Sequence, residues 1–173
     1  MTFIKYDMQD ESMKMALLPL YQTYEAEISN EKLEDIFPTN AFDKNFEYFT
    51  AYFEGKTTYI CIINGKYKGF VTFHIDCEDT PGYASGYEGW GHISELYIDR
   101  QLRKQGLGKS MVKRAEEELK KIDVTSLYLM NLLQENTNFW VSLGYIDTGK
   151  IVPEEGGRIF EKQLISSCIL FDK

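Results

Sequence analysis

The segment Arg100–Ser110, with the sequence RQLRKQGLGKS, contains the residues with the clearest chemical potential. Gly106 and Gly108 let the backbone approach a ligand closely. The first N–H groups of a helix that begins here would have no helical partner, and the helix dipole favours an anion beside them. The cationic side chains of the segment include Arg103, Lys104 and Lys109. These features predict a site for a phosphate or a pyrophosphate.

Three other interpretations of this segment compete with a pyrophosphate site. A nucleotide P-loop would need a glycine at the position of Arg103, and a dinucleotide fingerprint would need a third glycine at Met111. Both are therefore disfavoured. A tight turn whose basic residues only decorate a helix stays open, because the segment alone does not distinguish it from an anion site.

The turn requires a strand before it and a helix after it. The strand is expected at His92–Asp99, and the helix at Leu107–Lys121, where apolar residues recur on one face. Upstream, the β-branched and aromatic runs Thr57–Ile63 and Tyr67–Asp76 are joined by Asn64-Gly65, a dipeptide typical of tight hairpins. The segment therefore lies within an alternation of strands and helices.

The remaining elements follow from hydrophobic periodicity. A helix is predicted over Gln9–Glu27, which Pro19 should kink or split, and another over Ala41–Phe53, whose phenylalanine stripe predicts core or lid packing. The other predicted elements are the strands Phe3–Tyr6, Ser126–Leu132, Tyr145–Thr148 and Arg158–Ile165 and the short helix Thr137–Ser142. A loop, Glu78–Gly91, interrupts the sheet.

Length and composition indicate one globular domain over residues 1–173. The 173 residues are 43% hydrophobic and 14% aromatic, which suits a packed core. A net charge of −8 disfavours nucleic acid and anionic membranes as partners and would attract a cation. No apolar run approaches the roughly 20 residues of a membrane helix, and the N-terminus lacks a signal-peptide pattern. A cytoplasmic protein is therefore expected.

The cysteines and histidines favour neither a disulfide frame nor a metal site. Cys61, Cys77 and Cys168 contain no CxxC pair, and His74 and His92 belong to no cluster with ligand spacing. We therefore expect free thiols and no metal cofactor.

Two motifs resemble those of the GNAT acetyltransferases. His92–Asp99 followed by Arg103-x-x-Gly106-x-Gly108 is similar to the strand and the [RQ]-x-x-G-x-[GA] signature of that family, and Phe139–Tyr145 resembles its later F-Y-x-x-L-G-[FY] phrase. The order of the surrounding elements agrees over nearly the whole chain. The resemblance implies an α/β (α+β) fold with a central mixed, mostly antiparallel sheet of six to seven strands, flanked by about four helices.

The resemblance also implies that acetyl-CoA is the co-substrate. Backbone N–H groups of the signature would hold its pyrophosphate; the residues concerned are Arg103, Lys104, Gln105, Gly106, Leu107, Gly108, Lys109 and Ser110. The end of the preceding strand, Leu96, Tyr97 and Ile98, would pair with the pantetheine arm, and a main-chain amide there would polarise the thioester carbonyl. Asn136 would give the pantetheine a polar contact, with an ordinary helix cap as the alternative.

The implied reaction is direct attack of an amine on the acetyl thioester. A lysine-like amine, with a pKa of about 10.4, must first lose a proton. Glu95 is the candidate base, directly or through a water, unless it only holds a charge; His92 is a weaker candidate. The family commonly protonates the leaving thiolate with a tyrosine where this chain has Trp140. Water or Tyr145 would have to replace that tyrosine.

The loop Glu78–Gly91 is the candidate acceptor site. Its aromatic residues Tyr83, Tyr87 and Trp90 lie in sequence beside acids, and together they would hold a cationic amine by charge and cation–π contact. Trp140 is a further candidate contact. The alternative is a solvated loop that packs over its own aromatics.

Two classes of function stay open. The first is an N-acetyltransferase that acts on a small cationic amine, or else on a peptide amine. The second is a catalytically weak or silent coenzyme A-binding module, which Trp140 suggests. Members of the family are often dimers, and the apolar tail made of Leu164-Ile165 and Cys168–Phe171 would suit a homodimer.

Overall fold

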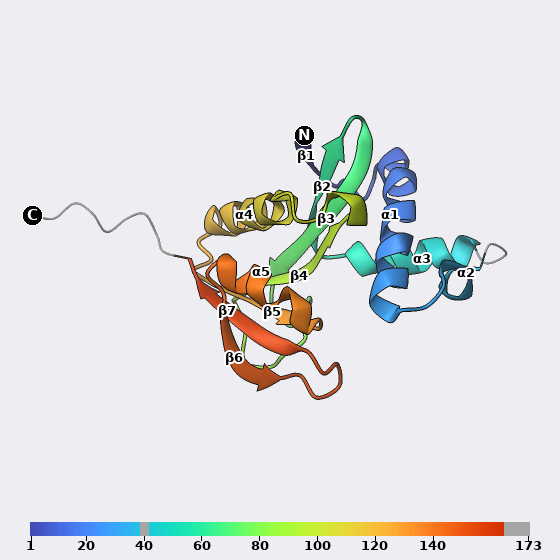
Figure 1. Ribbon diagram of the computed structural model, residues 1–173. Helices are drawn as coiled ribbons and strands as arrows, with labels where there is room; N and C mark the ends of the chain where they lie inside the picture. The colour runs from blue at the N-terminus through green and yellow to red at the C-terminus, as the bar shows by residue number, and fades with distance from the viewer. Residues whose placement is uncertain (39–41, 165–173) are drawn as a thin grey trace, which may run out of the picture. The chain divides into compact units, whose positions relative to one another are not determined.

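The computed structural model describes residues 1–38 and 42–164, which form a seven-stranded sheet with five α-helices (Figure 1). The strands are β1 (Thr2–Lys5), β2 (Thr57–Ile63), β3 (Lys66–Ile75), β4 (Gly91–Ile98), β5 (Ser126–Asn131), β6 (Ile146–Ile151) and β7 (Arg158–Gln163). The helices are α1 (Glu11–Ser29), α2 (Leu33–Ile36), α3 (Phe42–Phe53), α4 (Leu107–Lys120) and α5 (Thr137–Ser142). Strand order is β1-β2-β3-β4-β5-β7-β6, with a parallel β4–β5 pair and antiparallel β1–β2, β5–β7 and β6–β7 pairs. The predicted α/β fold is confirmed, and the short α2 makes five described helices where about four were expected.

The described residues group into two compact units. The first unit comprises Met1–Thr72 and Leu96–Met111, and the second comprises Phe73–Glu95 and residues 112–164. Each unit is described by itself below. The expectation of one domain over residues 1–173 stays a prediction.

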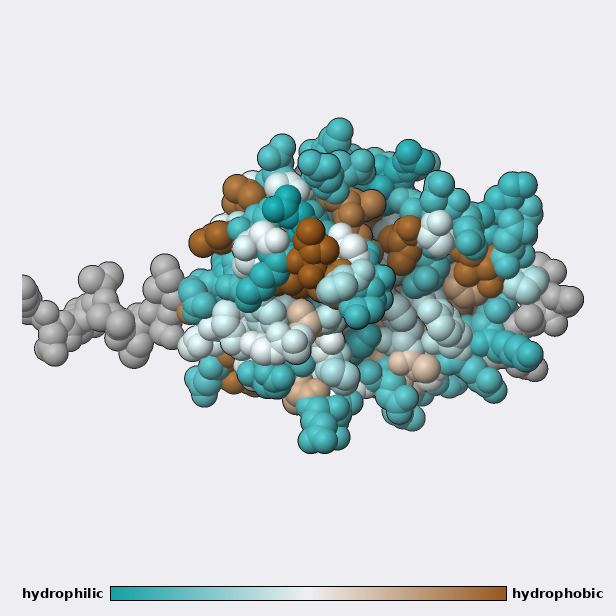
Figure 2. Space-filling model, turned by 90° about the horizontal axis from the view of Figure 1, so that it is seen from below, coloured by the Kyte–Doolittle hydropathy of each residue, from teal (hydrophilic) through white to brown (hydrophobic). Residues whose placement is uncertain are grey.

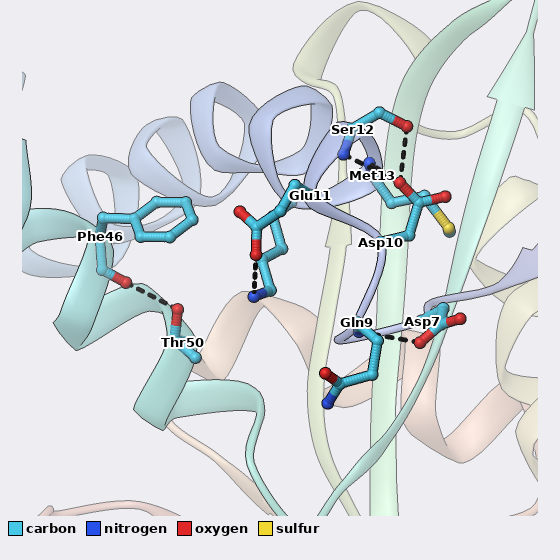
Figure 3. Close-up of polar contacts among 9 residues, drawn as sticks. Asp7, Gln9, Asp10, Glu11, Ser12, Met13, Phe46 and Thr50 are labelled. Atoms are coloured by element: carbon cyan, nitrogen blue, oxygen red, sulfur yellow. Dashed lines mark hydrogen bonds and ion pairs between the residues drawn. The ribbon is translucent and has the colours of Figure 1, made fainter.

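In the first unit, α1 begins at a side-chain cap that Figure 3 shows in detail. Asp10 accepts hydrogen bonds from the backbone N–H groups of Ser12 (2.9 Å) and Met13 (3.1 Å), which satisfies two of the donors that a helix start leaves open (Figure 3). Of the two effects expected of Pro19, the split is wrong, because α1 runs through Pro19 without a break, and the kink stays a prediction. Buried residues on both sides of the proline, such as Leu17 and Tyr21, hold the two halves in one helix.

The core of the first unit is largely aromatic. Tyr21 is fully buried and makes edge contacts with Phe49 and Phe53 of α3, at centroid distances of 5.4 and 5.5 Å. These two phenylalanines belong to the predicted stripe, so its core role is confirmed for them. The β2–β3 hairpin is confirmed as well: Asn64 and Gly65 have φ angles of 52° and 72°, as the tight turn requires.

In the second unit, β5 and β7 pair along their whole length, and β6 lies beyond β7. β4 pairs with β5 at its start, through Gly91–Leu127 and His92–Tyr128. Gly91 is a glycine because a Cβ there would approach the Leu127 side chain to 2.5 Å. The start of β4 is therefore held tightly against β5.

The surface seen in Figure 2 is mostly hydrophilic, with hydrophobic side chains in several separate groups. Among residues 1–38 and 42–164, no helix combines the length and the low polarity that a membrane span needs. The apolar tail expected to support a dimer lies outside the described residues except for Leu164, which is buried. The dimer stays a prediction.

Candidate functional site

The predicted anion site adopts an unusual backbone conformation. Arg103 is extended, Lys104 follows with a φ of 63°, and Gly106 has a φ of 83° just before α4 begins at Leu107. A Cβ placed on Gly106 would meet no atom within 4 Å, so space is not what requires glycine there. Glycine is required there by the positive φ angle, which glycine adopts without a steric cost. Lys104 adopts the same left-handed region without being a glycine, a strained conformation that is typical of ligand sites.

The turn presents donors and charge to solvent. The first helical bond of this end of α4 runs from the Ser110 N–H to the Gly106 carbonyl (3.1 Å), and the N–H groups before Ser110 precede the point where helical acceptors begin. Lys104, Gln105 and Gly106 are exposed, and so is Lys109. A pyrophosphate needs open donors, positive charge and room, and this turn supplies all three. The residues present therefore fit the coenzyme's pyrophosphate.

The Arg103 side chain does not extend into solvent as a free charge. Its Nε donates to the Ile98 carbonyl (2.9 Å), and its Nη2 donates to the Glu27 carboxylate of α1 (2.5 Å). The carboxylate also accepts the Tyr97 hydroxyl (2.9 Å). Sequence reasoning missed Glu27, since nothing in the pattern of α1 marks it.

In the second unit, Glu95 lies beside an aromatic side chain of the long loop. Glu95 is 8% exposed, and its Oε1 accepts a hydrogen bond from the Tyr83 hydroxyl at 3.2 Å. Sequence reasoning proposed both residues but not their contact. A buried carboxylate joined to a partly exposed tyrosine can take a proton from a group that binds near that tyrosine.

His92, the weaker base candidate, is packed on all sides that the structure describes. It is 1% exposed, its ring stacks on Tyr128 at 4.4 Å, and its Nδ1 lies 3.4 Å from Nε2 of His74. The Tyr83 ring contacts it edge-on at 5.2 Å. This environment places His92 under the site rather than on its surface.

A pocket of about 420 Å³ opens in the second unit between the end of β3 and the loop that follows. Its lining is Asp76, Cys77, Glu78, Pro81, Gly82, Tyr83, Ala84, Ser85 and Glu88. Three of these nine side chains are carboxylates and none is basic. A cavity with this charge attracts a cation.

Asp76 organises the loop around the pocket. Its carboxylate accepts the Gly82 N–H (3.0 Å) and the hydroxyl of buried Tyr128, while its backbone carbonyl accepts the Gly89 N–H (2.8 Å). A Cβ on Gly82 would overlap the Tyr128 hydroxyl, so only glycine fits there. Sequence reasoning missed Asp76, which was assigned to the end of a strand; its position between strand and loop was the only signal.

The other predicted acceptor contacts lie apart from the pocket lining. Tyr87 is 3% exposed, stacks on Tyr128 at 4.3 Å and donates its hydroxyl to Glu161 at 2.6 Å. Trp90 packs edge-on against Tyr87 at 5.2 Å. Of the three predicted loop aromatics, Tyr83 lines the pocket, whereas Tyr87 and Trp90 pack in the hydrophobic cluster beneath the loop.

Comparison with known proteins decides the family. The model of the acetyltransferase (GNAT) family matches residues 20–145, well over half of the chain. The chain belongs to the GNAT acetyltransferase family. It is therefore an acyl-CoA-dependent transferase.

Solved structures of other GNAT proteins share the fold at low sequence identity. An aminoglycoside 6'-N-acetyltransferase complexed with coenzyme A is 15% identical, with a TM-score of 0.65 over 96% of this chain and 98% of that one. The PaiA N-acetyltransferase of Thermoplasma acidophilum in complex with coenzyme A is 13% identical, with a TM-score of 0.59 over 95% and 100%. A predicted acetyltransferase of Clostridium acetobutylicum with acetyl-CoA is 18% identical, with a TM-score of 0.60 over 86% and 92%. No curated protein matches the chain.

This GNAT protein places a tryptophan where the family commonly has a tyrosine. Trp140 is 8% exposed and packs edge-on against Tyr145 at 5.5 Å. Tyr145 is 2% exposed, and burial, followed by the nearby Glu116 carboxylate, raises its pKa well above the usual value. The predicted use of Tyr145 as a proton donor would require the thiolate to reach this buried hydroxyl.

Two further predicted groups can be located in this GNAT chain. Asn136 is exposed and occupies the N-cap position of α5, but its side chain makes no capping hydrogen bond, so it caps the helix by position only. Leu96 is half-buried, while Tyr97 and Ile98 are buried at the end of β4. Among the residues that the structure describes, no group of three or more histidines, cysteines or acids is placed to hold a metal ion.

Proposed function

We propose that this protein transfers an acetyl group from acetyl-CoA to a small cationic primary amine by direct attack. The acidic pocket of the second unit carries this proposal. Asp76, Glu78 and Glu88 line about 420 Å³ with no basic side chain among the lining residues. Each carboxylate within about 4 Å of an ammonium group contributes about 1–4 kcal/mol in partly solvated surroundings. The relative described as an aminoglycoside 6'-N-acetyltransferase is consistent with a polycationic acceptor.

The amine must be deprotonated before it can react, because a primary amine with a pKa of about 10.4 is almost entirely protonated at pH 7. Glu95 is the base in our proposal. Tyr83 supports this assignment, since it lines the pocket and also donates to Glu95 at 3.2 Å. The amine proton passes to Glu95, directly or through a water. The nitrogen lone pair then forms the C–N bond to the acetyl carbon, and the C–S bond breaks. The nitrogen releases its second proton to solvent, which leaves a neutral amide.

The coenzyme would be held by the turn before α4. Backbone N–H groups between Lys104 and Lys109, with the side chains of those two lysines, bind the pyrophosphate, because the N–H groups of Arg103 and Ser110 already donate to the Arg100 and Gly106 carbonyls. Leu96, Tyr97 and Ile98 offer main-chain groups to the pantetheine arm. Glu95 immediately precedes Leu96 in β4, so the base and the thioester contact are neighbours in the sequence. Asn136, whose side chain does not cap α5, is the proposed further pantetheine contact.

The leaving thiolate requires no protein acid in this proposal. A thiol with a pKa of about 8.5 is a tolerable leaving group, and water can protonate it. Trp140 is mostly buried and its indole N–H is no acid at neutral pH. This observation also favours the second candidate function, a coenzyme A-binding module with weak or no catalysis.

Acceptor profiling tests the proposal. Release of free coenzyme A thiol would be measured with acetyl-CoA and a panel of polycationic, monocationic, neutral and anionic amines. We expect thiol release that depends on added amine and is fastest with polycations. Release with neutral or anionic amines alone would refute the acceptor class. Coenzyme binding without amine-dependent release would establish the silent module instead.

A charge-matched pair of variants locates the acceptor. Glu78→Gln/Glu88→Gln should raise the acceptor KM about 5- to 30-fold, equivalent to about 1–2 kcal/mol for two screened charges, and leave the acetyl-CoA KM unchanged. Glu154→Gln/Glu155→Gln removes the same charge from two exposed acids of the β6–β7 turn and serves as the control. Equal changes in both double variants would show that net charge, not the pocket, attracts the amine.

A further inference from the structure

Glu27 joins the end of α1 to the coenzyme turn within the first unit. Its two carboxylate oxygens accept different donors: Oε1 takes the Tyr97 hydroxyl at 2.9 Å, and Oε2 takes Nη2 of Arg103 at 2.5 Å. Arg103 also donates Nε to the Ile98 carbonyl at 2.9 Å, and its guanidinium carbon lies 5.4 Å from the centre of the Tyr97 ring. The Arg103 side chain is therefore fixed by protein groups on three sides.

The acid is unfavourably placed for helix stability. Glu27 lies in the last turn of α1, where the helix dipole disfavours a negative charge and which itself contains no basic residue. The ion pair with Arg103 is also partly solvated, with side chains 30% and 41% exposed, and such pairs add little to folding stability. Stability alone does not explain this contact.

The Tyr97 side chain is held rigidly by the core of the first unit. It is 4% exposed and packs between Tyr24 and Phe70, at centroid distances of 5.6 and 5.9 Å. Burial, and then the hydrogen bond to Glu27, raise the pKa of its hydroxyl, so it remains a proton donor to the carboxylate. A rigid tyrosine thus orients Glu27, and Glu27 orients Arg103.

Arg103 is the residue at which the strained part of the turn begins. Lys104, which follows it, has a φ of 63°, and Gly106 has a φ of 83°. A non-glycine residue keeps a left-handed conformation only when its surroundings hold it there. The tether on Arg103 supplies such a hold immediately before Lys104.

We propose that Glu27 is a positioning residue for acetyl-CoA: through Arg103 it keeps the turn in the shape that binds the pyrophosphate, without touching the coenzyme. This inference rests on the proposed use of the turn for the coenzyme. A preformed turn loses less conformational freedom on binding, which raises affinity. The opposite arrangement, in which Glu27 competes with the pyrophosphate for Arg103, predicts the opposite sign when Glu27 is neutralised.

The test compares coenzyme A, which carries the pyrophosphate, with S-acetylpantetheine, which lacks it. Dissociation constants of both would be measured by calorimetry or thermal shift for the wild type, Glu27→Gln and Tyr97→Phe, with circular dichroism to confirm folding. Glu27→Gln should weaken coenzyme A binding about 3- to 10-fold and leave the binding of S-acetylpantetheine unchanged. Tyr97→Phe, which removes the hydroxyl that orients Glu27, should weaken coenzyme A binding less. Glu118→Gln is the control, since it breaks the partly exposed ion pairs of Glu118 with Arg114 and Lys121, away from the turn, and should change neither constant.

Three results would overturn the inference. Unchanged or tighter binding of coenzyme A by Glu27→Gln excludes a positioning role, and tighter binding establishes competition for Arg103. Equal losses with both probes show that Glu27 supports the fold and not the turn. A wild type that binds coenzyme A no better than S-acetylpantetheine removes the pyrophosphate site itself, and with it the proposed function. The first two results leave that function standing.

Discussion

Two glycines, one in each unit, are required for opposite physical reasons. Gly106 in the coenzyme turn has a φ of 83° and open space where a Cβ would lie. Gly82 in the pocket loop has no room for a Cβ, because the Tyr128 hydroxyl occupies that place. The first glycine is required by its own backbone, and the second by a residue 46 positions later in the sequence. The turn before α4 thus takes its backbone shape mainly from its own residues, with one distant tether from Glu27, whereas the pocket loop is shaped by distant contacts.

The difference extends to charge. The turn gathers positive charge from neighbours in the sequence, with Lys104 and Lys109 beside the start of α4. The pocket gathers Asp76, Glu78 and Glu88 by folding the loop back through the bonds of Asp76 to Gly82 and Tyr128. A short motif is enough to hold the acetyl donor that the family shares, whereas recognition of a particular amine acceptor needs a shaped pocket.

The largest effect should come from the base in the second unit. Glu95→Gln removes the proposed proton acceptor and should lower kcat about 10²- to 10⁴-fold, while the thermal shift with coenzyme A stays unchanged. Steady-state kinetics with a cationic acceptor would measure the first quantity. This result would assign chemistry to the second unit and coenzyme binding to the first.

The control for that variant is another carboxylate that holds a tyrosine. Glu161 accepts the Tyr87 hydroxyl at 2.6 Å in the same unit, but neither Glu161 nor Tyr87 lines the pocket. Glu161→Gln should keep kcat within about twofold, because Glu161 lies outside the pocket and a glutamine amide oxygen can still accept the Tyr87 hydroxyl. A Glu95→Gln enzyme that is as active as Glu161→Gln would show that Glu95 only holds Tyr83 in place.

Gly82→Ala tests the pocket loop. The new methyl group must displace Tyr128 or the loop, and overpacking of this kind costs about 1–3 kcal/mol of unfolding free energy. Urea denaturation would measure that loss, and the acceptor KM should rise because the carboxylates move. Coenzyme A binding should be retained, and its loss would contradict the separation of the two regions.

Gly106→Ala tests the turn from the other direction. Alanine fits the space but disfavours the left-handed φ by about 1–2 kcal/mol, so coenzyme A should bind about 5- to 30-fold more weakly. Gly65→Ala is the matched control, because Gly65 has a φ of 72° and the same open space in the β2–β3 hairpin. Calorimetry should show a loss for Gly106→Ala alone; equal affinities in the two variants would mean that the turn does not contact the coenzyme.

This contrast explains how much could be predicted from the sequence. The hairpin at Asn64-Gly65, the helix after Gly106 and the short helix Thr137–Ser142 depend on local turn chemistry and periodicity, and all three are confirmed. The continuity of α1 through Pro19 could not be predicted, because packing of both halves overrides a local helix breaker.

The candidate site residues divide in the same way, into those that depend on neighbours in the sequence and those that depend on distant partners. The turn at 103–110 was recognisable, since its residues are contiguous. Other features of the site depend on partners that are distant in the sequence. Tyr83 contacts Glu95, 12 residues later. Tyr128 is the partner of both Asp76 and Tyr87, 52 and 41 residues later. No local pattern reports such distant contacts.

The smallest effect concerns pH and the residue that leads into the turn. Asp99 accepts a hydrogen bond from Lys68 at 2.5 Å, and this bond, with a further one from the Gln101 N–H, holds the pKa of its carboxyl below its usual range. A lowered pKa in the folded state stabilises the fold above the unfolded value, near 3.9, and that stabilisation is lost as the pH falls through the folded value. Asp99→Asn should therefore be less stable than the wild type at pH 7 by at most about 1 kcal/mol, since the pair is partly solvated.

The pH dependence separates this electrostatic effect from a packing defect. The gap between the urea midpoints of the wild type and Asp99→Asn should shrink as the pH falls below about 4 and close once the pH is below the lowered folded-state pKa, where the wild-type carboxyl is neutral as well. A gap that persists at low pH would show that the substitution disturbs packing instead. Asp79→Asn, an exposed acid in the pocket loop, should show no gap at either pH. The two regions thus differ in their charged side chains as well as in their backbones. Asp99 beside the turn is bound by groups of the fold, whereas Asp79 of the pocket loop is exposed to solvent.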